Sequence, residues 1–137
     1  MLSKLDAFRW LAPVLLRVVV GLIFTVHGYH KLLGGMEGFT QYVVTLGFPA
    51  FMAWVAAGTE FFGGVALILG LFTRWAALGV GCVMAVAIVK VHWAAGLVGD
   101  HGYEYPLTLL CVALSLILMG GGTLSLDRYA IERRRAV

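Results

Sequence analysis

The sequence predicts an all-α membrane protein, a transmembrane four-helix antiparallel bundle. Of its 137 residues, 61% are hydrophobic and only 12% are charged. A soluble domain of this length cannot bury so much apolar surface. The apolar residues form four runs, each close to the roughly 20 residues that a helix needs to cross a bilayer. The connections are short, so residues 1–137 form one membrane domain without a separate soluble catalytic domain.

Each predicted span has recognisable start or end signals. Pro13, Pro49 and Pro106 lie in the first turns of three spans, where a missing N–H removes no helical hydrogen bond. Thr73 is the expected N-cap of the third span, and the three glycines at 120–122 end the fourth. The four spans are residues 12–33, 49–71, 74–95 and 103–119.

The charges between the spans predict the orientation. Basic residues lie before the first span, at Arg74 and in the tail, whereas the loops at 34–48 and 96–102 carry only acidic charges. The positive-inside rule therefore places both termini in the cytoplasm of a multi-pass inner-membrane protein. The basic tail, residues 123–137, is expected to contact lipid headgroups as an amphipathic helix and does not indicate nucleic acid.

Small residues mark the faces through which the spans are expected to pack. Ala77, Gly81 and Ala85 repeat every four residues on the third span. Gly21 and Gly28 lie seven apart on the first span, and the second has a pair of glycines at 63–64. Small side chains allow close approach of transmembrane helices, so these positions predict helix contacts.

Arg17 and Glu60 are charged residues within apolar runs. A charge in lipid costs a few kcal/mol on insertion scales, so such side chains normally face inward, pair, and mark a functional site. Arg17 is expected one or two turns from the estimated depth of Glu60, on the adjoining helix of a hairpin, and the long arginine side chain can span that distance. The sequence therefore predicts a structural ion pair between Arg17 and Glu60. A role in function beyond holding helix register stays open.

A second polar group lies where the spans approach the outer face. Lys31 ends the first span, His92 ends the third and Glu104 begins the fourth, with His27 one turn before Lys31. Because antiparallel helices bring these points to one depth, we predict a substrate-binding pocket around the four residues, between spans one, three and four. Glu104 is expected to pair with Lys31 or Lys90. Separate anchoring of each side chain to headgroups is the alternative.

Few residues suggest a resident cofactor. Cys82 and Cys111 stand alone in different spans and at different depths, which disfavours a disulfide and favours a role as small apolar filler. His27 and His92 make a haem or metal site conceivable, but their spacing is a weak signal. The sequence therefore predicts no metal, disfavours haem and identifies no catalytic residue.

Several polar motifs follow one another along the chain. They are L-L-R at 15–17, H-G-Y-H-K-L at 27–32, E-F-F-G-G-V-A-L-I-L-G-L-F-T-R at 60–74, G-Y-E-Y-P at 102–106 and L-S-L-D-R at 124–128. In this order they resemble the DoxX family of small four-helix membrane proteins over nearly the whole chain. The resemblance carries the family's polar positions onto Arg17, Lys31, Glu60, Arg74 and His92. Some members are subunits of a thiosulfate:quinone oxidoreductase, others resemble the membrane anchor of an assembly that detoxifies oxidants, and many have no assigned activity.

Two functions follow as hypotheses. The first is a subunit of a membrane-associated oxidoreductase complex that binds a quinone or a small sulfur species at an outer-facing pocket. A sulfur anion would suit Lys31 and Lys90, and a quinone carbonyl would suit a histidine donor. The chain has no evident redox centre of its own, so partner subunits would supply it, and whether the chain is itself an enzyme stays open. The alternative is a non-enzymatic scaffold or small-molecule permease, which would need a homo-oligomer to enclose enough volume.

Overall fold

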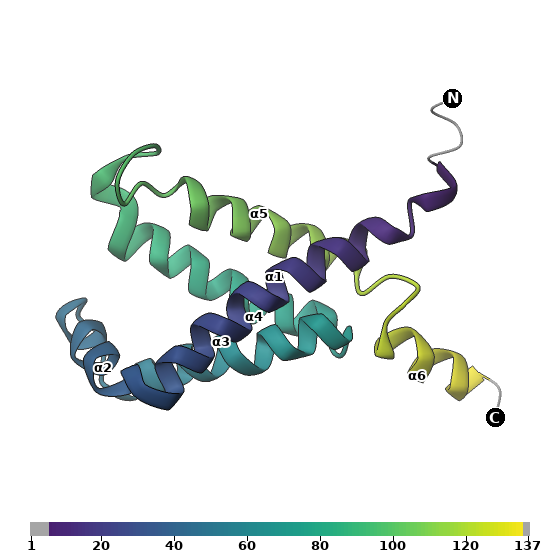
Figure 1. Ribbon diagram of the computed structural model, residues 1–137, viewed down its shortest axis with the longest axis horizontal. Coiled ribbons are helices and arrows are strands. Elements are labelled where there is room, and N and C mark those ends of the chain that lie inside the picture. The colour runs from purple at the N-terminus through teal and green to yellow at the C-terminus, as the bar shows by residue number, and fades with distance from the viewer. Residues whose placement is uncertain (1–5, 136–137) are drawn as a thin grey trace.

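The computed structural model describes residues 6–135, which fold into helices joined by short turns (Figure 1). Lys4 and the last two residues of the predicted tail lie outside the described residues. The prediction of an all-α four-helix bundle is confirmed. The bundle helices are α1 (Leu11–His30), α3 (Phe51–Leu69), α4 (Thr73–Ala87) and α5 (Glu104–Met119). The segments that connect them are the π-helical turn η2 (Lys31–Gly35), α2 (Met36–Thr45), the π-helical turn η3 (Ile88–His92) and the short turn η4 (Trp93–Ala95). The C-terminal helix α6 (Leu126–Arg135) follows the bundle.

The helices pack mainly against their neighbours in sequence. α1 packs along α3, and α4 packs against both α3 and α5. Figure 1 shows the start of α1 and the whole of α6 at one end of the bundle, with α2 at the other. This arrangement brings both ends of the described chain to the same end of the bundle. The side of the membrane on which that end lies stays a prediction.

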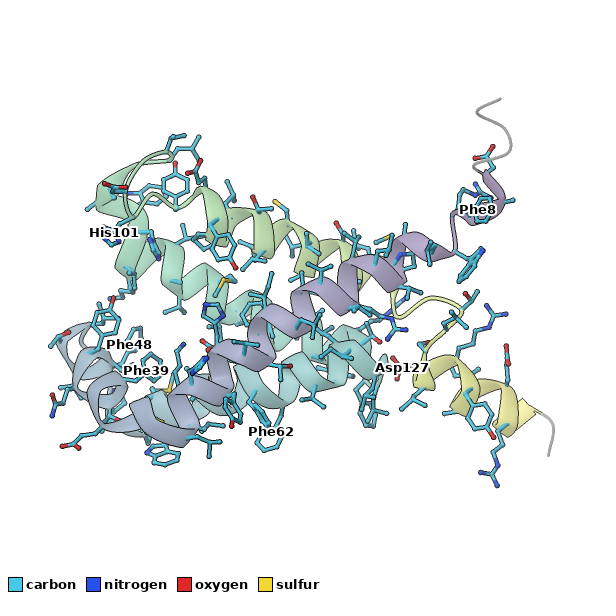
Figure 2. The ribbon with its side chains drawn as sticks, in the orientation of Figure 1. Phe8, Phe39, Phe48, Phe62, His101 and Asp127 are labelled. Atoms are coloured by element: carbon cyan, nitrogen blue, oxygen red, sulfur yellow. The ribbon has the colours of Figure 1, made fainter. Side chains whose placement is uncertain are left out.

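The helix lengths and surfaces suit a bilayer. Three helical segments are long and apolar enough to cross a membrane, whereas α5 has 16 residues and rises about 24 Å. Large apolar side chains point outward, including Phe62 (Figure 2), Trp75 and Leu118, and the last two are 72% and 79% exposed. Lipid tails solvate such surfaces well. The three longer segments are Leu11–Thr45, Phe51–Leu69 and Thr73–Ala95.

The segment after α1 differs from the prediction. The sequence predicts a loop over residues 34–48, but the chain continues helically through η2 and turns into α2 (Figure 1). Phe39, Val43 and Leu46 recur at helical spacing; Val43 is buried, and the other two are half-buried against the bundle. Four glycines and several polar residues in this segment conceal the apolar period in the sequence. The predicted loop is therefore wrong, because a short amphipathic helix covers the end of the bundle.

Glycines set the closest helix contact. A Cβ atom at Gly21 would lie 2.7 Å from the carbonyl oxygen of Gly64, and one at Gly28 would overlap the backbone of Phe61. The predicted glycine contact face between the first two spans is therefore confirmed. On α4, a Cβ atom at Gly81 would lie 3.5 Å from the Cβ of Ala113, which places the small-residue stripe against α5.

Asp127 fastens α6 to the turn between α3 and α4 (Figure 2). Its carboxylate accepts hydrogen bonds from the backbone N–H groups of Phe72 and Thr73 at 2.6 and 2.8 Å, and its own N–H donates to the carbonyl of Gly70 at 3.0 Å. A carboxylate at this position satisfies free N–H groups and the positive end of the helix dipole. Asp127, from the distant tail, therefore caps α4, and the predicted N-cap role of Thr73 is wrong.

The side chain of Arg17 extends from α1 to this same turn between α3 and α4. Its guanidinium donates hydrogen bonds to the carbonyls of Leu67 at 3.1 Å, Ile68 at 2.8 Å and Leu124. Leu67 and Ile68 belong to the last turn of α3, where carbonyls lack the usual i+4 partners within the helix and the helix dipole is negative. The Leu67 carbonyl also accepts a hydrogen bond from the N–H of Gly70 at 3.2 Å. We call this group of Arg17, Gly70, Thr73, Leu124 and Asp127 the Arg17 junction. It joins α1, the α3–α4 turn and the tail.

Candidate functional site

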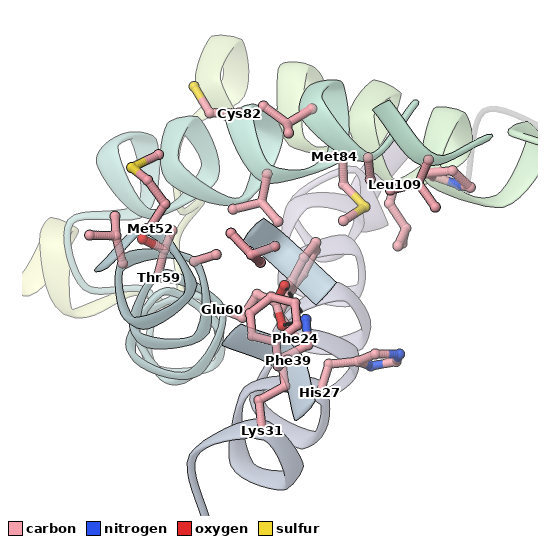
Figure 3. Close-up of a pocket in the computed structure, with 18 of the residues that line it drawn as sticks. Phe24, His27, Lys31, Phe39, Met52, Thr59, Glu60, Cys82, Met84 and Leu109 are labelled. Atoms are coloured by element: carbon pink, nitrogen blue, oxygen red, sulfur yellow. Dashed lines mark hydrogen bonds and ion pairs between the residues drawn. The ribbon is translucent and has the colours of Figure 1, made fainter. Parts of the chain in front are cut away.

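A cavity of about 690 Å³ lies between the helices, away from the Arg17 junction and towards the end of the bundle that carries α2. Side chains from α1, α2, α3, α4 and α5 form its wall, and most of them are apolar (Figure 3). The charged residues in this wall are Lys31 and Glu60, which Figure 3 places close to Phe24 and Phe39. The cavity is thus an apolar chamber with a small polar region.

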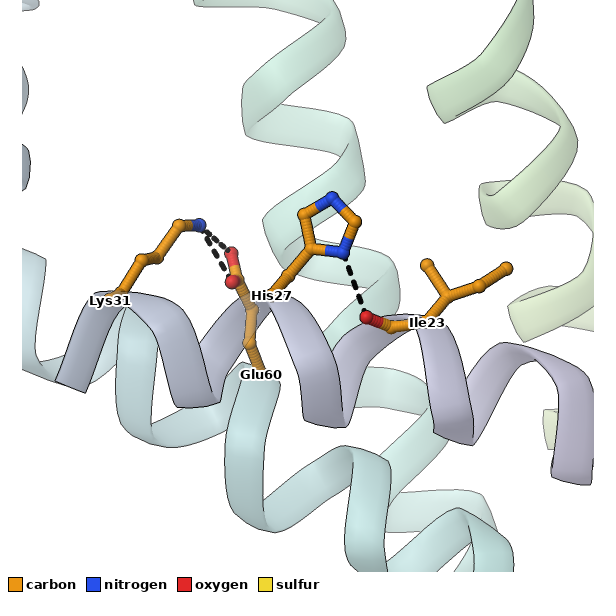
Figure 4. Close-up of polar contacts among 4 residues, drawn as sticks. All are labelled: Ile23, His27, Lys31 and Glu60. Carbon is orange, nitrogen blue, oxygen red and sulfur yellow. Dashed lines mark hydrogen bonds and ion pairs between the residues drawn. The ribbon is translucent and has the colours of Figure 1, made fainter. Parts of the chain in front are cut away.

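The polar region is built on an ion pair between Lys31 and Glu60 (Figure 4). The lysine ammonium donates to both carboxylate oxygens, at 2.7 Å to Oε1 and 2.6 Å to Oε2. The Glu60 side chain is only 4% exposed and that of Lys31 is 26% exposed. The ammonium also lies 4.3 Å from the centre of the Phe39 ring, at cation–π distance. Lys31 therefore neutralises the buried carboxylate and is itself held in one place.

The predicted ion pair between Arg17 and Glu60 is wrong. Gly64 packs on Gly21 and Thr25 of α1, so Glu60, one turn earlier on α3, lies level with the end of α1 near Lys31. Arg17 lies roughly 20 Å away along α1 by helical rise, in the Arg17 junction. The sequence does not specify where the two helices cross, so it places Glu60 too close to Arg17.

His27 and His92 both line the cavity, as the sequence predicts. The Nδ1 atom of His27 lies 2.8 Å from the carbonyl oxygen of Ile23, one turn earlier on α1 (Figure 4). The Nδ1 atom of His92 lies 2.7 Å from the carbonyl oxygen of His101, in the loop before α5. Each ring is therefore oriented by a backbone carbonyl, and His92 also ties the end of η3 to that loop.

Glu104 is absent from the cavity wall. It is exposed in the first turn of α5, whereas Tyr105 and Pro106 beside it line the cavity. Its predicted pairing with Lys31 or Lys90 is wrong, because Lys31 pairs with Glu60, and the ammonium of Lys90 lies 5.4 Å from the centre of the Phe48 ring. The predicted pocket therefore contains three of its four residues, His27, Lys31 and His92.

Sequence reasoning missed the wall that α2 and α3 contribute. Phe39, Tyr42 and Phe48 come from the segment that the sequence predicts as a loop. Glu60 also lines the cavity, although the sequence pairs it with Arg17. The helical spacing of Phe39, Val43 and Leu46 is the signal that could have revealed this wall. The two cysteines are both free, as expected, and Cys82 lines the cavity.

The sequence of this bundle matches a known family. The family model for DoxX covers residues 12–93, which is more than half of the chain. The chain belongs to the DoxX family. The two charged residues and the two histidines of the cavity, Lys31, Glu60, His27 and His92, lie within the DoxX match, whereas Leu124 and Asp127 of the Arg17 junction lie beyond it.

Similar proteins are bacterial. One from Bacillus subtilis (strain 168), named "Putative oxidoreductase CatD", is 36% identical over 125 residues, which are 91% of each chain. "Inner membrane protein YphA" of Escherichia coli (strain K12) is 32% identical over 127 residues, 85% of this chain and 90% of the relative. "Inner membrane protein YqjF" of the same organism is 30% identical over 114 residues, 82% and 86% of the two chains. No solved structure matches the chain.

The relatives and the helices together give the location. Two DoxX-like relatives are named as inner membrane proteins, and the chain has three helical segments able to cross a membrane. This DoxX-family chain is therefore a multi-pass inner membrane protein whose outer helix faces contact the lipid bilayer.

Proposed function

We propose that this DoxX-family protein is a quinone-binding subunit of a membrane-associated oxidoreductase complex. The observation that carries the proposal is the cavity, in which Lys31, Glu60, His27 and His92 contribute polar groups to an otherwise mostly apolar wall. Its volume of about 690 Å³ falls within the usual range of small-molecule sites. A quinone matches this wall in its distribution of polar and apolar groups, because it has an apolar ring and tail and two polar oxygens.

The cavity suits a quinone better than a small sulfur anion. A buried anion needs an unpaired cation or several donors, because its desolvation is costly. Lys31 is already neutralised by Glu60, and Lys90 is exposed beside Phe48, outside the cavity wall. Of the two ligand classes that the sequence suggests, the quinone is therefore the one we propose.

The redox part of the proposal has separate support. A relative that matches 91% of this chain has the word oxidoreductase in its name. We propose that this chain binds and orients the quinone through its own side chains, and that partner subunits supply the electron-carrying centre. This division leaves the chain without catalytic residues of its own.

Quinone binding to the purified chain tests the proposal. The full chain would be purified in mild detergent, its lipids extracted and searched for quinones by mass spectrometry, and the protein titrated with a short-chain 1,4-benzoquinone. Val83 lines the cavity, whereas Val89 is absent from its wall and is exposed. Val83→Phe should weaken binding at least about tenfold by filling the cavity, and Val89→Phe is the matched control.

The opposite results are equally clear. If no quinone co-purifies and neither the benzoquinone nor its hydroquinone binds on titration, the quinone proposal fails and the scaffold or permease alternative is favoured. If Val83→Phe and Val89→Phe have the same effect, the ligand binds elsewhere on the protein.

A further inference from the structure

The two cavity histidines share one hydrogen-bonding arrangement. In His27 and in His92, Nδ1 lies within 2.8 Å of a backbone carbonyl oxygen. A carbonyl can only accept a hydrogen bond, so each Nδ1 carries the proton and donates. In a neutral imidazole the other nitrogen, Nε2, is then an acceptor. Figure 4 shows the His27 ring with one nitrogen facing Ile23 and the other pointing away from α1.

When the other polar groups of the cavity are included, hydrogen-bond acceptors still outnumber donors among the groups with a fixed role. Lys31 is the fixed donor, and it already donates to both oxygens of Glu60. Those oxygens keep further lone pairs that can accept. The hydroxyl groups of Tyr42, Thr59 and Tyr105, which also line the cavity, can act as donors or as acceptors. The groups with fixed roles are therefore mostly acceptors.

We infer that the cavity selects the reduced, hydroquinone form of its ligand, whose phenolic O–H groups donate to Nε2 of His27 and of His92. This inference rests on the proposed quinone site and specifies the redox form that it prefers. A quinone presents only carbonyl oxygens, which are acceptors and would face the acceptor nitrogens without a shared proton. The sequence suggested a histidine donor for a quinone carbonyl, and the two backbone contacts reverse that role.

The unaltered protein allows a direct test with three matched probes. These are a short-chain alkyl 1,4-hydroquinone, the corresponding 1,4-benzoquinone, and the dimethyl ether of the hydroquinone, which has the same ring but no O–H group. Affinities would be measured anaerobically by calorimetry on the full chain in detergent. The hydroquinone should bind about tenfold or more tightly than either other probe, since it gains hydrogen bonds that they lack.

Variants assign the preference to the histidines. His27→Phe and His92→Phe keep an aromatic ring but lose the acceptor, so each should reduce the preference for hydroquinone over its dimethyl ether severalfold. His27→Gln keeps an acceptor oxygen and should restore part of it. His30→Phe is the matched control, because His30 lies on the same helix, packs edge-on against Tyr29 and is outside the cavity wall.

The results separate this inference from the proposed function. Equal binding of all three probes, or tighter binding of the benzoquinone, would overturn the preference for hydroquinone and leave the quinone site standing. Failure of all three probes to bind would overturn the proposed function and this inference with it. Loss of the preference in His30→Phe, with none in His27→Phe and His92→Phe, would also overturn it.

Discussion

The buried charges at the two ends of the bundle are stabilised in different ways. At the Arg17 junction, the cation lies on the carbonyls that end α3, and the Asp127 carboxylate lies on the N–H groups that begin α4. Each charge there is balanced by a helix end. At the cavity, the charges of Lys31 and Glu60 balance each other directly.

The space around the charges also differs. A Cβ atom at Gly70 would lie 2.5 Å from Nη1 of Arg17 and 2.6 Å from Cβ of Ser125, so the Arg17 junction is filled. The Lys31–Glu60 pair instead borders about 690 Å³ of unfilled space together with two histidines. A buried charge alone therefore does not indicate a ligand site. The combination of a buried charge, unused acceptors and open volume does.

The largest expected effect concerns which end faces outward, and it is all-or-none. After Cys82 and Cys111 are replaced by alanine, Val98→Cys in the loop at the cavity end should react with a membrane-impermeant maleimide in intact spheroplasts. Thr123→Cys, beside the Arg17 junction, should react only after permeabilisation, because the basic segments are predicted to be cytoplasmic. Reaction of Thr123→Cys from outside would invert the topology and place the cavity at the cytoplasmic end.

The next largest effect is expected at the Arg17 junction. Arg17→Met should lower the free energy of unfolding by about 3 kcal/mol or more, because it removes the charged donor from three carbonyls. Denaturant unfolding in detergent would measure it. The matched control is Arg128→Met, which breaks an exposed pair with Glu132 and should cost less than about 0.5 kcal/mol. Equal losses in the two variants would contradict a structural role for Arg17.

A double-mutant cycle sharpens the assignment of partners. Glu60→Gln and Lys31→Met should each destabilise the protein, and the double variant should cost about 1–3 kcal/mol less than their sum. The corresponding cycle between Glu60 and Arg17 should be additive within about 0.5 kcal/mol, since the two residues lie at different ends of the bundle. Coupling to Arg17 without coupling to Lys31 would restore the pair that the sequence suggests.

These predictions depend on features that the sequence reveals unequally. Hydrophobic runs, prolines and small residues predict the four bundle helices and their glycine contacts, because membrane packing imposes a simple pattern. His27, Lys31 and His92 are predicted to share one pocket because antiparallel spans bring their ends together. The partner of Glu60 depends instead on where α1 crosses α3, which no spacing within one helix specifies.

Two other features differ from the prediction, each for its own reason. Glycines lie within and on both sides of α2, and its apolar period is short, so composition predicts a loop although Phe39 and Val43 face the bundle. Asp127 caps α4 from 54 residues away along the chain, whereas capping rules consider the residues next to a helix. Contacts between distant segments therefore account for much of what the sequence failed to predict.

The smallest expected effect tests whether the two ends are independent. Asp127→Asn keeps an acceptor oxygen for one of the N–H groups of Phe72 and Thr73 but loses the charge at the start of α4. It should lower the free energy of unfolding by about 1 kcal/mol, measured by denaturant unfolding. Glu132→Gln, a neutralised carboxylate elsewhere on α6, is the control and should cost less than about 0.5 kcal/mol. Because the Arg17 junction is filled and distant from the cavity, hydroquinone affinity should be unchanged in Asp127→Asn. An altered affinity would show that the junction and the cavity are coupled through α1 or α3, and would contradict the separation of structural and ligand-binding charges.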